Sequence, residues 1–302
     1  NNTNGDVDAI LRGANIQEQW DYAISQDHEI VFVTGWNEWA TNKRAPESEE
    51  QTIAWFVDSF NTEFSRDIEM TKSPTYIVDE KTGKYIEEGY GDNYYMQLIQ
   101  NIRRYKGIEG DLPMPVSMTI DINGNLSQWD SVNRIYKNIS IDNMERNFGD
   151  YKQAAADNFL REIRVTHDKK NIYFLIKTDS DITLPVEGKT NWMNLFIGVD
   201  GSKEGSWESY NFVVNRNPFS LSKTSLEAFD NGYSLKHIGN VDYNVNGNIM
   251  QIAIPRTMLG IEKDDFKIYF KCADSIEKES DIMDYYVSGD SMPIGRLSYM
   301  YS

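Results

Sequence analysis

The residues best suited to chemistry are Trp36, Asn37, Glu38 and Trp39, which follow the short apolar segment Ile30–Val33. That segment is rich in β-branched residues, which predicts a fully buried strand. Two indole rings offer flat apolar faces to the C–H groups of a pyranose, while a carboxyl group beside an amide binds hydroxyl groups or transfers protons. The pattern predicts a sugar site just beyond a strand end. The alternative is a strand end where both tryptophans join the core and Glu38 is solvated.

The segment Gly35–Trp39 resembles the last-strand motif of the glycoside hydrolase family 99 endo-α-mannosidases and their relatives, which are retaining (β/α)8 barrels. That motif reads Phe-Asn-Glu-Trp-x-Glu, and the chain matches its Asn-Glu-Trp part. The resemblance implies that Glu38 is a catalytic carboxylate, assisting the sugar 2-hydroxyl as a base at the end of the barrel where active sites lie. The family's second glutamate, the acid, corresponds to Thr41. Because glycoside hydrolysis generally needs a carboxyl pair, the second acid is unassigned.

A later segment, Asp67-Ile68-Glu69, is similar to a Gln-Ile-Glu-Pro segment of the same family. The resemblance implies that its charged residues bind substrate together with the indoles and the amide described above. The substrate-binding residues implied in this way are Trp36, Asn37, Trp39, Arg66, Asp67 and Glu69. Glu69 and residues before Asn1 are candidates for the missing acid. The alternative interpretation of this segment is a surface ion-pair cluster, which contributes little stability.

The first 112 residues show helical patterns around the predicted strand. Apolar residues recur at helical spacing in residues 6–26, 51–60 and 92–106, and residues 76–88 form two strand-like runs around a Thr-Gly pair, which predicts a β-hairpin. Residues 1–112 are therefore interpreted as the carboxy-terminal portion of a (β/α)8 barrel. A whole barrel needs about 250 residues, so most of it is expected before Asn1, and the chain is interpreted as a fragment or processed form.

Beyond the linker Gly110–Pro115, short alternating strands replace the helical patterns. Strands are predicted at 118–122, 162–166, 172–177, 193–199, 209–214, 249–254 and 266–272, with Asn-Gly turns starting at 123, 231 and 246. Many short strands with few helices predict an antiparallel β-sandwich over residues 113–302. The predicted fold class is an α+β chain of two domains, a partial (β/α)8 barrel followed by a β-sandwich.

The second half resembles the family-9 carbohydrate-binding modules through phrases that occur in order. They are Ile120–Trp129, then NIYFLIKT, NLFIGVD and YNFVVNR, and finally Ile254–Gly260. The resemblance implies a module that binds oligo- or polysaccharide, in a family that often holds structural calcium. Asp200, Ser202 and Glu204 form an oxygen-rich turn that fits calcium. An Asx turn is the alternative, and no metal site is assigned.

Sugar binding by such a module needs an exposed aromatic ring with polar neighbours. Trp129 and Trp192 adjoin apolar strands, so both are expected in the core. Trp207 lies in the polar loop GSKEGSWESY and is predicted to be the exposed platform. Asn211 and Arg216 flank the next strand and are either hydrogen-bonding partners of the sugar or structural residues. A single stacking ring predicts millimolar affinity at best, about −4 kcal/mol.

Composition limits the partners and the location of the protein. The formal net charge of −17 over 302 residues argues against nucleic acid and anionic membranes, which need a basic patch. No apolar stretch reaches the ~18 residues of a membrane span, and the single cysteine, Cys272, cannot form a disulfide within the chain. The expected function is that of the carboxy-terminal part of a secreted glycoside hydrolase-like protein of polysaccharide degradation, with no cofactor. The alternative is a non-catalytic carbohydrate-binding or structural module.

Overall fold

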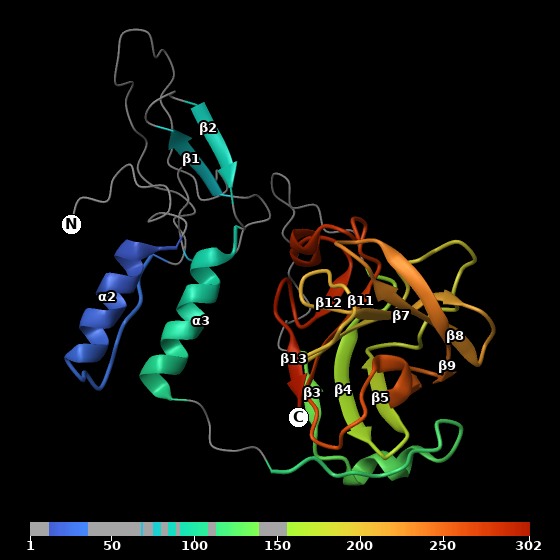
Figure 1. Cartoon of the computed structure of the whole chain (residues 1–302). Helices are drawn as coiled ribbons and strands as arrows, with labels where there is room; N and C mark the ends of the chain where they lie inside the picture. The colour runs from blue at the N-terminus through green and yellow to red at the C-terminus, as the bar shows by residue number, and fades with distance from the viewer. Residues whose placement is uncertain are drawn as a thin grey trace. The chain divides into compact units, whose positions relative to one another are not determined.

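A computed structural model describes residues 12–35, 68, 75–79, 84–88, 91–107, 113–138 and 156–302. The chain divides into two compact units, Asn1–Asp111 and Leu112–Ser302 (Figure 1). The division falls beside the proline-containing linker at which the sequence pattern changes from helical to alternating. Each unit is described separately.

Unit 1 contains two helices and a hairpin among its described residues. Helix α2 (Ala14–Ser25) begins after Gly13, whose φ of 60° is left-handed, so the helix is shorter than the predicted span of 6–26. Strands β1 (Thr75–Asp79) and β2 (Lys84–Glu88) pair antiparallel, which confirms the predicted hairpin. Helix α3 (Asn93–Lys106) is also confirmed, with three basic residues in its last turn that favour the negative end of the helix dipole.

The two helices of unit 1 share a small apolar cluster. Its buried members are Trp20 from α2, Leu98 from α3 and Ile68 from the chain between β1 and the extended segment after α2. An amide network joins the same helices, because Gln17 Nε2 donates to Asn101 Oδ1 at 3.1 Å and Asn101 Nδ2 donates to Gln17 Oε1 at 3.1 Å. The described core of unit 1 is therefore a helix pair, and the assignment of unit 1 to a barrel stays a prediction.

The prediction of a buried strand at Ile30–Val33 is wrong for this structure. The segment is extended but pairs with no strand among the described residues, and the side chains of Ile30 and Phe32 are 82% and 85% exposed. Only Val31 packs, in part, against the helix cluster. An apolar run becomes a buried strand when neighbours bond its backbone and cover both faces, and the described residues of unit 1 provide neither.

Unit 2 is built on one antiparallel sheet of eleven strands (Figure 1). The strands are β3 (Ile135–Lys137), β4 (Leu160–His167), β5 (Asn171–Thr178), β6 (Asn194–Val199), β7 (Phe212–Pro218), β8 (Lys223–Phe229), β9 (Leu235–Asn246), β10 (Ile249–Pro255), β11 (Ile268–Asp274), β12 (Asp290–Met292) and β13 (Tyr299–Tyr301). They follow the order β12-β11-β6-β7-β8-β9-β10-β5-β4-β3, and β13 also pairs with β11. The predicted antiparallel β architecture of residues 113–302 is confirmed.

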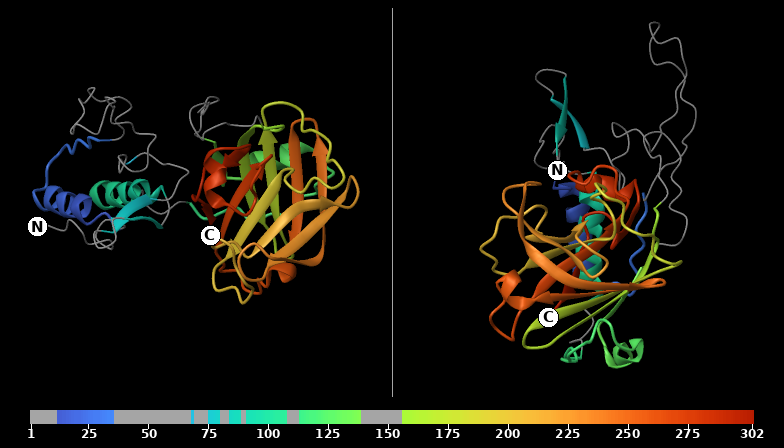
Figure 2. Two further views of the ribbon diagram at one scale, coloured as in Figure 1. Left: turned by 90° about the horizontal axis from the view of Figure 1, so that it is seen from above. Right: turned by 90° about the vertical axis from the view of Figure 1, so that its right-hand side faces the viewer.

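The sheet curls until its two edges meet, as the ribbon of unit 2 in Figure 2 shows. Side chains, rather than a backbone ladder, join the edges. Tyr136 on β3 donates its hydroxyl to the carbonyl of Met300 at 2.6 Å, and Tyr299 on β13 donates to the carbonyl of Lys137 at 2.9 Å. The Tyr136 ring also meets Phe270 on β11 edge to face, with centroids 4.9 Å apart. The curl gives the unit an inner face and an outer face.

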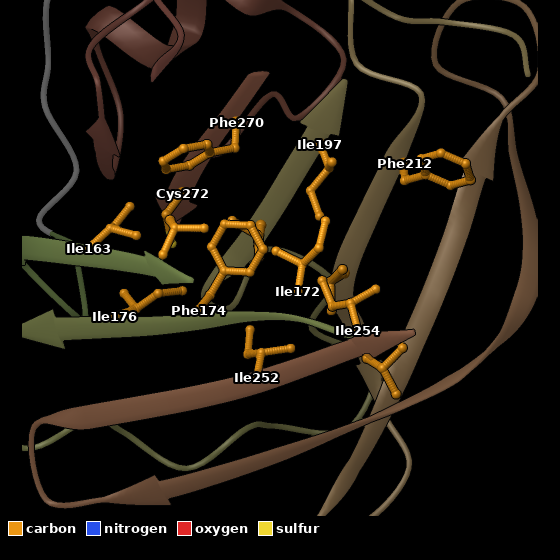
Figure 3. Packing of buried hydrophobic residues seen from close by; sticks show 14 of the residues in the cluster. Ile163, Ile172, Phe174, Ile176, Ile197, Phe212, Ile252, Ile254, Phe270 and Cys272 are labelled. Carbon is orange, nitrogen blue, oxygen red and sulfur yellow. The ribbon is translucent and has the colours of Figure 1, made fainter. Parts of the chain in front are cut away.

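The main core fills the inner face (Figure 3). In β5, Ile172, Phe174 and Ile176 point inward toward residues of β6, β10 and β11, and each is fully buried. Burying one such side chain contributes roughly 1.5–3 kcal/mol. The alternate residues Tyr173 and Leu175 are buried on the outer face. Strand β5 is covered on both sides, which explains its apolar sequence.

A second cluster covers the outer face of β5 and corrects another prediction. Residues 118–122 form no strand. Ser117 makes an isolated bridge with His167, and the amide of Met118 donates to the carbonyl of His167, but the pairing goes no further. Instead Ile120 and Ile122 pack with Trp129 against the back of β5. Trp129 lies in the 3-10 helix η1 (Leu126–Ser131), whose first residues are capped by the Asn125 side chain. The alternating apolar residues are buried as expected, but by side-chain packing rather than in the sheet.

Candidate functional site

Unit 2 contains a cavity of about 490 Å³ where the end of β4 meets the loop before β11. Its lining residues are Met114, Pro115, Ser117, His167, Asp168, Lys169, Asp264, Asp265, Phe266, Tyr301 and Ser302. The volume lies in the range of sites for small molecules, ≈ 300–1,000 Å³. The lining combines aromatic rings with carboxylates. We call this site the His167 cavity.

One wall of the His167 cavity is the segment that follows the linker, and hydrogen bonds fix it to β4. Thr166 donates its hydroxyl to the carbonyl of Val116 at 2.6 Å, and Ser117 donates to the carbonyl of His167 at 3.0 Å. The Asn133 side chain accepts from the amide of Val116 at 3.0 Å and donates to the carbonyl of Met114 at 2.9 Å. The wall is therefore held in place by unit 2 itself.

Three rings form the floor of the cavity. The Tyr301 hydroxyl lies 2.6 Å from His167 Nδ1, and the His167 and Phe266 rings meet edge to face with centroids 5.1 Å apart. Burial, and then the positive charge of Arg256, lower the pKa of His167, while Asp264 and Asp168 oppose this shift. Burial raises the pKa of Tyr301. Both shifts favour the uncharged forms of the two groups, and one hydrogen bond joins the phenol to the imidazole.

Asp168 is a structural carboxylate at the rim. One oxygen accepts from the amides of Lys170 and Asn171, each at 2.7 Å. The other accepts from the hydroxyls of Thr119 and Tyr173, each at 2.8 Å. Partial burial alone would raise its pKa, but these four hydrogen bonds outweigh burial and hold the pKa below its usual value. Asp168 thus stays ionised, and its charge is met by neutral donors.

Arg256 ties together the two segments that carry the cavity. Its Nη1 donates to Asp264 Oδ1 at 2.9 Å and to the carbonyl of Asp168 at 3.2 Å, and its Nη2 donates to the carbonyl of Lys263. The guanidinium carbon lies 5.0 Å from the centre of the Phe266 ring. Hydrogen bonding to Arg256 keeps the pKa of the exposed Asp264 low. Arg256 itself is 3% exposed and so acts as a brace.

The predicted catalytic and substrate-binding residues of unit 1 lie outside the described residues. These are Trp36, Asn37, Glu38, Trp39, Arg66, Asp67 and Glu69, together with Thr41. The structure does describe one residue of each segment: the amide of Ile68 donates to the carbonyl of Gly35 at 3.4 Å, and Ile68 is buried. The two segments that resemble the family-99 motifs therefore meet at these two residues.

The prediction that Trp207 is exposed is wrong, since only 6% of it is accessible. Trp207 and Tyr210 exchange backbone hydrogen bonds of 2.9 and 2.8 Å, which folds the polar loop back onto the sheet. The indole packs edge to face on Tyr233 with centroids 4.8 Å apart, and also contacts Phe229 and Tyr285. The residues next to Trp207 in the sequence are polar, whereas the rings that cover it come from other segments, so the local sequence did not predict its burial. Trp207 therefore offers no open face to a sugar.

The other two tryptophans are in the core, as predicted. Trp129 is 1% exposed and donates Nε1 to Gln251 Oε1 at 2.7 Å. Trp192 is 2% exposed and donates Nε1 to the carbonyl of Thr183 at 3.0 Å. Each indole N–H thus has the partner that a buried polar group requires.

Asn211 and Arg216 both take structural roles. Asn211 accepts from the amide of Val199 at 2.8 Å and donates to the carbonyl of Gly205 at 3.1 Å, which shapes the loop that carries Trp207. Arg216 pairs with Glu227 at 3.3 Å and with Glu279 at 3.2 Å. These pairs join β7, β8 and the loop after β11 at the outer face.

The oxygen-rich turn after β6 is closed by its own hydrogen bonds. The amide of Ser202 donates to the carbonyl of Val199 at 3.0 Å, and the amide of Glu204 donates to Ser202 Oγ at 3.2 Å. In the part of the chain that the structure describes, no group of three or more His, Cys, Asp or Glu side chains is placed to hold a metal ion. Within those same residues, no helix is long and apolar enough to cross a membrane.

The sequence was compared with protein-family models and with curated proteins, and neither comparison gives a match. The site is therefore interpreted from its own chemistry. Rings on the floor, carboxylates at the rim and a fixed wall suit a small polar molecule that has both apolar faces and hydroxyl groups.

Proposed function

We propose that unit 2 is a carbohydrate-binding module and that the His167 cavity is its sugar site. The observation that carries this proposal is a cavity of about 490 Å³ that combines Phe266 and the His167–Tyr301 pair with three aspartates. Flat rings pack on the C–H faces of a pyranose, and carboxylates accept hydrogen bonds from its hydroxyls. The curled antiparallel sheet that encloses the core is compatible with the β-sandwich that the family-9 resemblance implies, and it supports the proposal to that extent.

The cavity suits a weakly bound sugar ring. Phe266 is half-buried, with Arg256 5.0 Å from its ring centre, so it provides a limited apolar surface. The hydrogen bond to Tyr301 uses Nδ1 of His167 and not Nε2, and Asp265 is an exposed acceptor. One ring with two or three hydrogen bonds corresponds to millimolar affinity, about −4 kcal/mol.

The parent protein, in this proposal, is a secreted or cell-surface glycoside hydrolase-like protein that acts on an oligo- or polysaccharide. Glu38 is its candidate catalytic carboxylate, and the remainder of the barrel precedes this chain. The motif at Gly35–Trp39 and the hydrogen bond between Ile68 and Gly35 support this part of the proposal. The alternative is a chain that binds or braces without activity of its own, which the replacement of the family's second glutamate by Thr41 favours.

Calorimetric titration of the whole chain with glucose- and mannose-based saccharides tests the sugar site. We expect a dissociation constant in the millimolar range that weakens at least fivefold in Phe266→Ala. Phe219→Ala is the matched control, because Phe219 is 78% exposed and does not line the cavity. Absence of heat up to 50 mM sugar, or equal binding by both variants, would contradict the proposed site. A circular dichroism spectrum of each variant confirms that it is folded.

A further inference from the structure

We infer that the His167 cavity selects a sugar bearing a free ammonium group over the neutral sugar of the same shape. This inference rests on the proposed sugar site and adds its substrate class, an amino sugar. It follows from the charged side chains around the cavity and from the hydrogen bonds and ion pairs that already engage some of them.

The charges at the cavity do not balance. Three lining residues are carboxylates, Asp168, Asp264 and Asp265, whereas Lys169 is the one basic residue of the lining. The ionised state of Asp168 is fixed by four hydrogen bonds from neutral groups, none of which brings a positive charge. Arg256 lies beside the lining and neutralises Asp264. An unbalanced negative charge therefore remains next to an apolar floor.

Asp265 is the carboxylate that is open to a ligand. Asp168 has both oxygens engaged by two donors each, and Asp264 gives one oxygen to Arg256. Asp265 is exposed, lines the cavity and directly precedes Phe266 in the chain. A pyranose on the Phe266 ring thus has an acceptor for a charged substituent on the adjacent residue. An ammonium group would donate a charge-assisted hydrogen bond to this carboxylate. A hydroxyl group would donate a weaker hydrogen bond, because the hydroxyl carries no charge.

The neutral imidazole of His167 adds to this selection. Burial lowers the pKa of His167, which disfavours a positive charge on the ring that would repel an ammonium group. The apolar floor formed with Phe266 limits solvent on one side of the ligand, and partial desolvation strengthens an ion pair relative to open water. The opposite preference, for a sugar acid, would bring a second anion toward Asp265.

The test compares three sugars of the same skeleton by calorimetry on the whole chain. At 20 mM salt we expect glucosamine to bind about fivefold more tightly than glucose and N-acetylglucosamine, which is the upper end for a partly exposed ion pair. At 500 mM salt we expect the preference to fall below about twofold, because screening weakens such pairs. Methylammonium chloride at equal concentration should not displace glucosamine, since it lacks the ring that packs on Phe266.

Two variants separate the contributions of charge and shape. Asp265→Asn should bring glucosamine and glucose to equal affinity, because the side chain then offers both sugars the same uncharged acceptor. Glu262→Gln is the matched control, because Glu262 is an exposed acid of the same loop that does not line this cavity, and it should keep the preference. Phe266→Ala should weaken both sugars together.

The possible failures are distinguishable. If glucose and glucosamine bind equally to the unmodified chain, the amino-sugar preference is wrong while the sugar site stands. If the preference persists in Asp265→Asn, the assigned carboxylate is wrong and the inference falls. If methylammonium competes fully, the site recognises a cation rather than an amino sugar. If no sugar binds, both the proposed function and this inference are contradicted.

Discussion

Replacing Lys271 by methionine should stabilise unit 2, and the gain should shrink as the pH rises. Lys271 lies on β11 and is 0% exposed. Its Nζ donates to Ser291 Oγ at 3.2 Å and to the carbonyl of Pro293. Burial lowers the pKa of Lys271 well below its usual value, and the smaller effects of Cys272 and Asp290 do not reverse this. Burial therefore favours the neutral form of the amine, and the prediction below takes that form as the folded one.

The magnitude follows from the linkage between protonation and folding. The folded-state pKa is lower than the unfolded-state value of about 10.4, so the unfolded chain binds the extra proton. While the folded amine is neutral, each pH unit below about 10.4 costs about 1.4 kcal/mol, which is about 3 kcal/mol at pH 8. Lys271→Met removes this cost and two hydrogen bonds worth roughly 1 kcal/mol each. Ser291 Oγ still donates to the carbonyl of Pro293 at 2.9 Å, so that carbonyl keeps a donor.

We therefore expect Lys271→Met to gain about 1 kcal/mol in the free energy of unfolding at pH 8 and to lose about 1 kcal/mol at pH 9.5, from the same linkage. Urea unfolding followed by tryptophan fluorescence at both pH values measures the change relative to the unmodified chain. Lys177→Met, at an exposed position on β5, is the control and should show no such trend. A variant whose effect is the same at pH 8 and pH 9.5 would refute the reasoning, because it would mean that the folded amine is charged.

Three further changes test other parts of the structure. Arg216→Met should destabilise unit 2 by about 3–5 kcal/mol, because it leaves Glu227 and Glu279 without their cation. Adding Glu227→Gln should restore part of this stability, as measured by urea unfolding. If it restores none, charge is not the cause of the loss. Trp207→Ala should lower stability by about 3–5 kcal/mol through the cavity it creates, while calorimetry shows unchanged sugar affinity. If the parent protein hydrolyses a glycan, as proposed, Glu38→Gln should reduce its turnover by about 10²–10⁴-fold, and unchanged turnover would remove Glu38 from the mechanism.

The local sequence pattern was sufficient to predict those helices and strands whose structure depends on their own residues. Helix α3 has a stripe of apolar residues, basic residues in its last turn and Gly107 at its end, with a φ of 80°. Strands β5 and β10 are continuous apolar runs that pair with each other from Ile249 to Pro255. Strand β8 was missed, because Thr224, Ser225 and Glu227 are polar yet buried. Glu227 is tolerated there because Arg216, from β7, pairs with it, and Asn217 and Ser225 donate hydrogen bonds to it.

The His167 cavity could not be found from local pattern. No residue near His167 in the sequence marks it as part of a site, and Phe266 and Tyr301 are about a hundred or more residues away. One signal was present: Arg256 follows the apolar run of β10, and a cation that is 3% exposed requires a carboxylate partner. That partner, Asp264, lies eight residues later and marks the cavity loop. The prediction that Trp207 is exposed was wrong for the same reason, since the aromatic rings that cover it belong to distant segments.

Chemical-shift mapping by NMR tests the central claim, that the His167 cavity of unit 2 binds a sugar, most directly. The isotopically labelled whole chain is titrated with glucosamine and, separately, with glucose. The account predicts that the largest amide shifts cluster at His167, Asp265, Phe266 and Tyr301, with saturation in the millimolar range and larger shifts at Asp265 for glucosamine. Shifts confined to other surfaces of the chain, or no saturable shifts with either sugar, would contradict it.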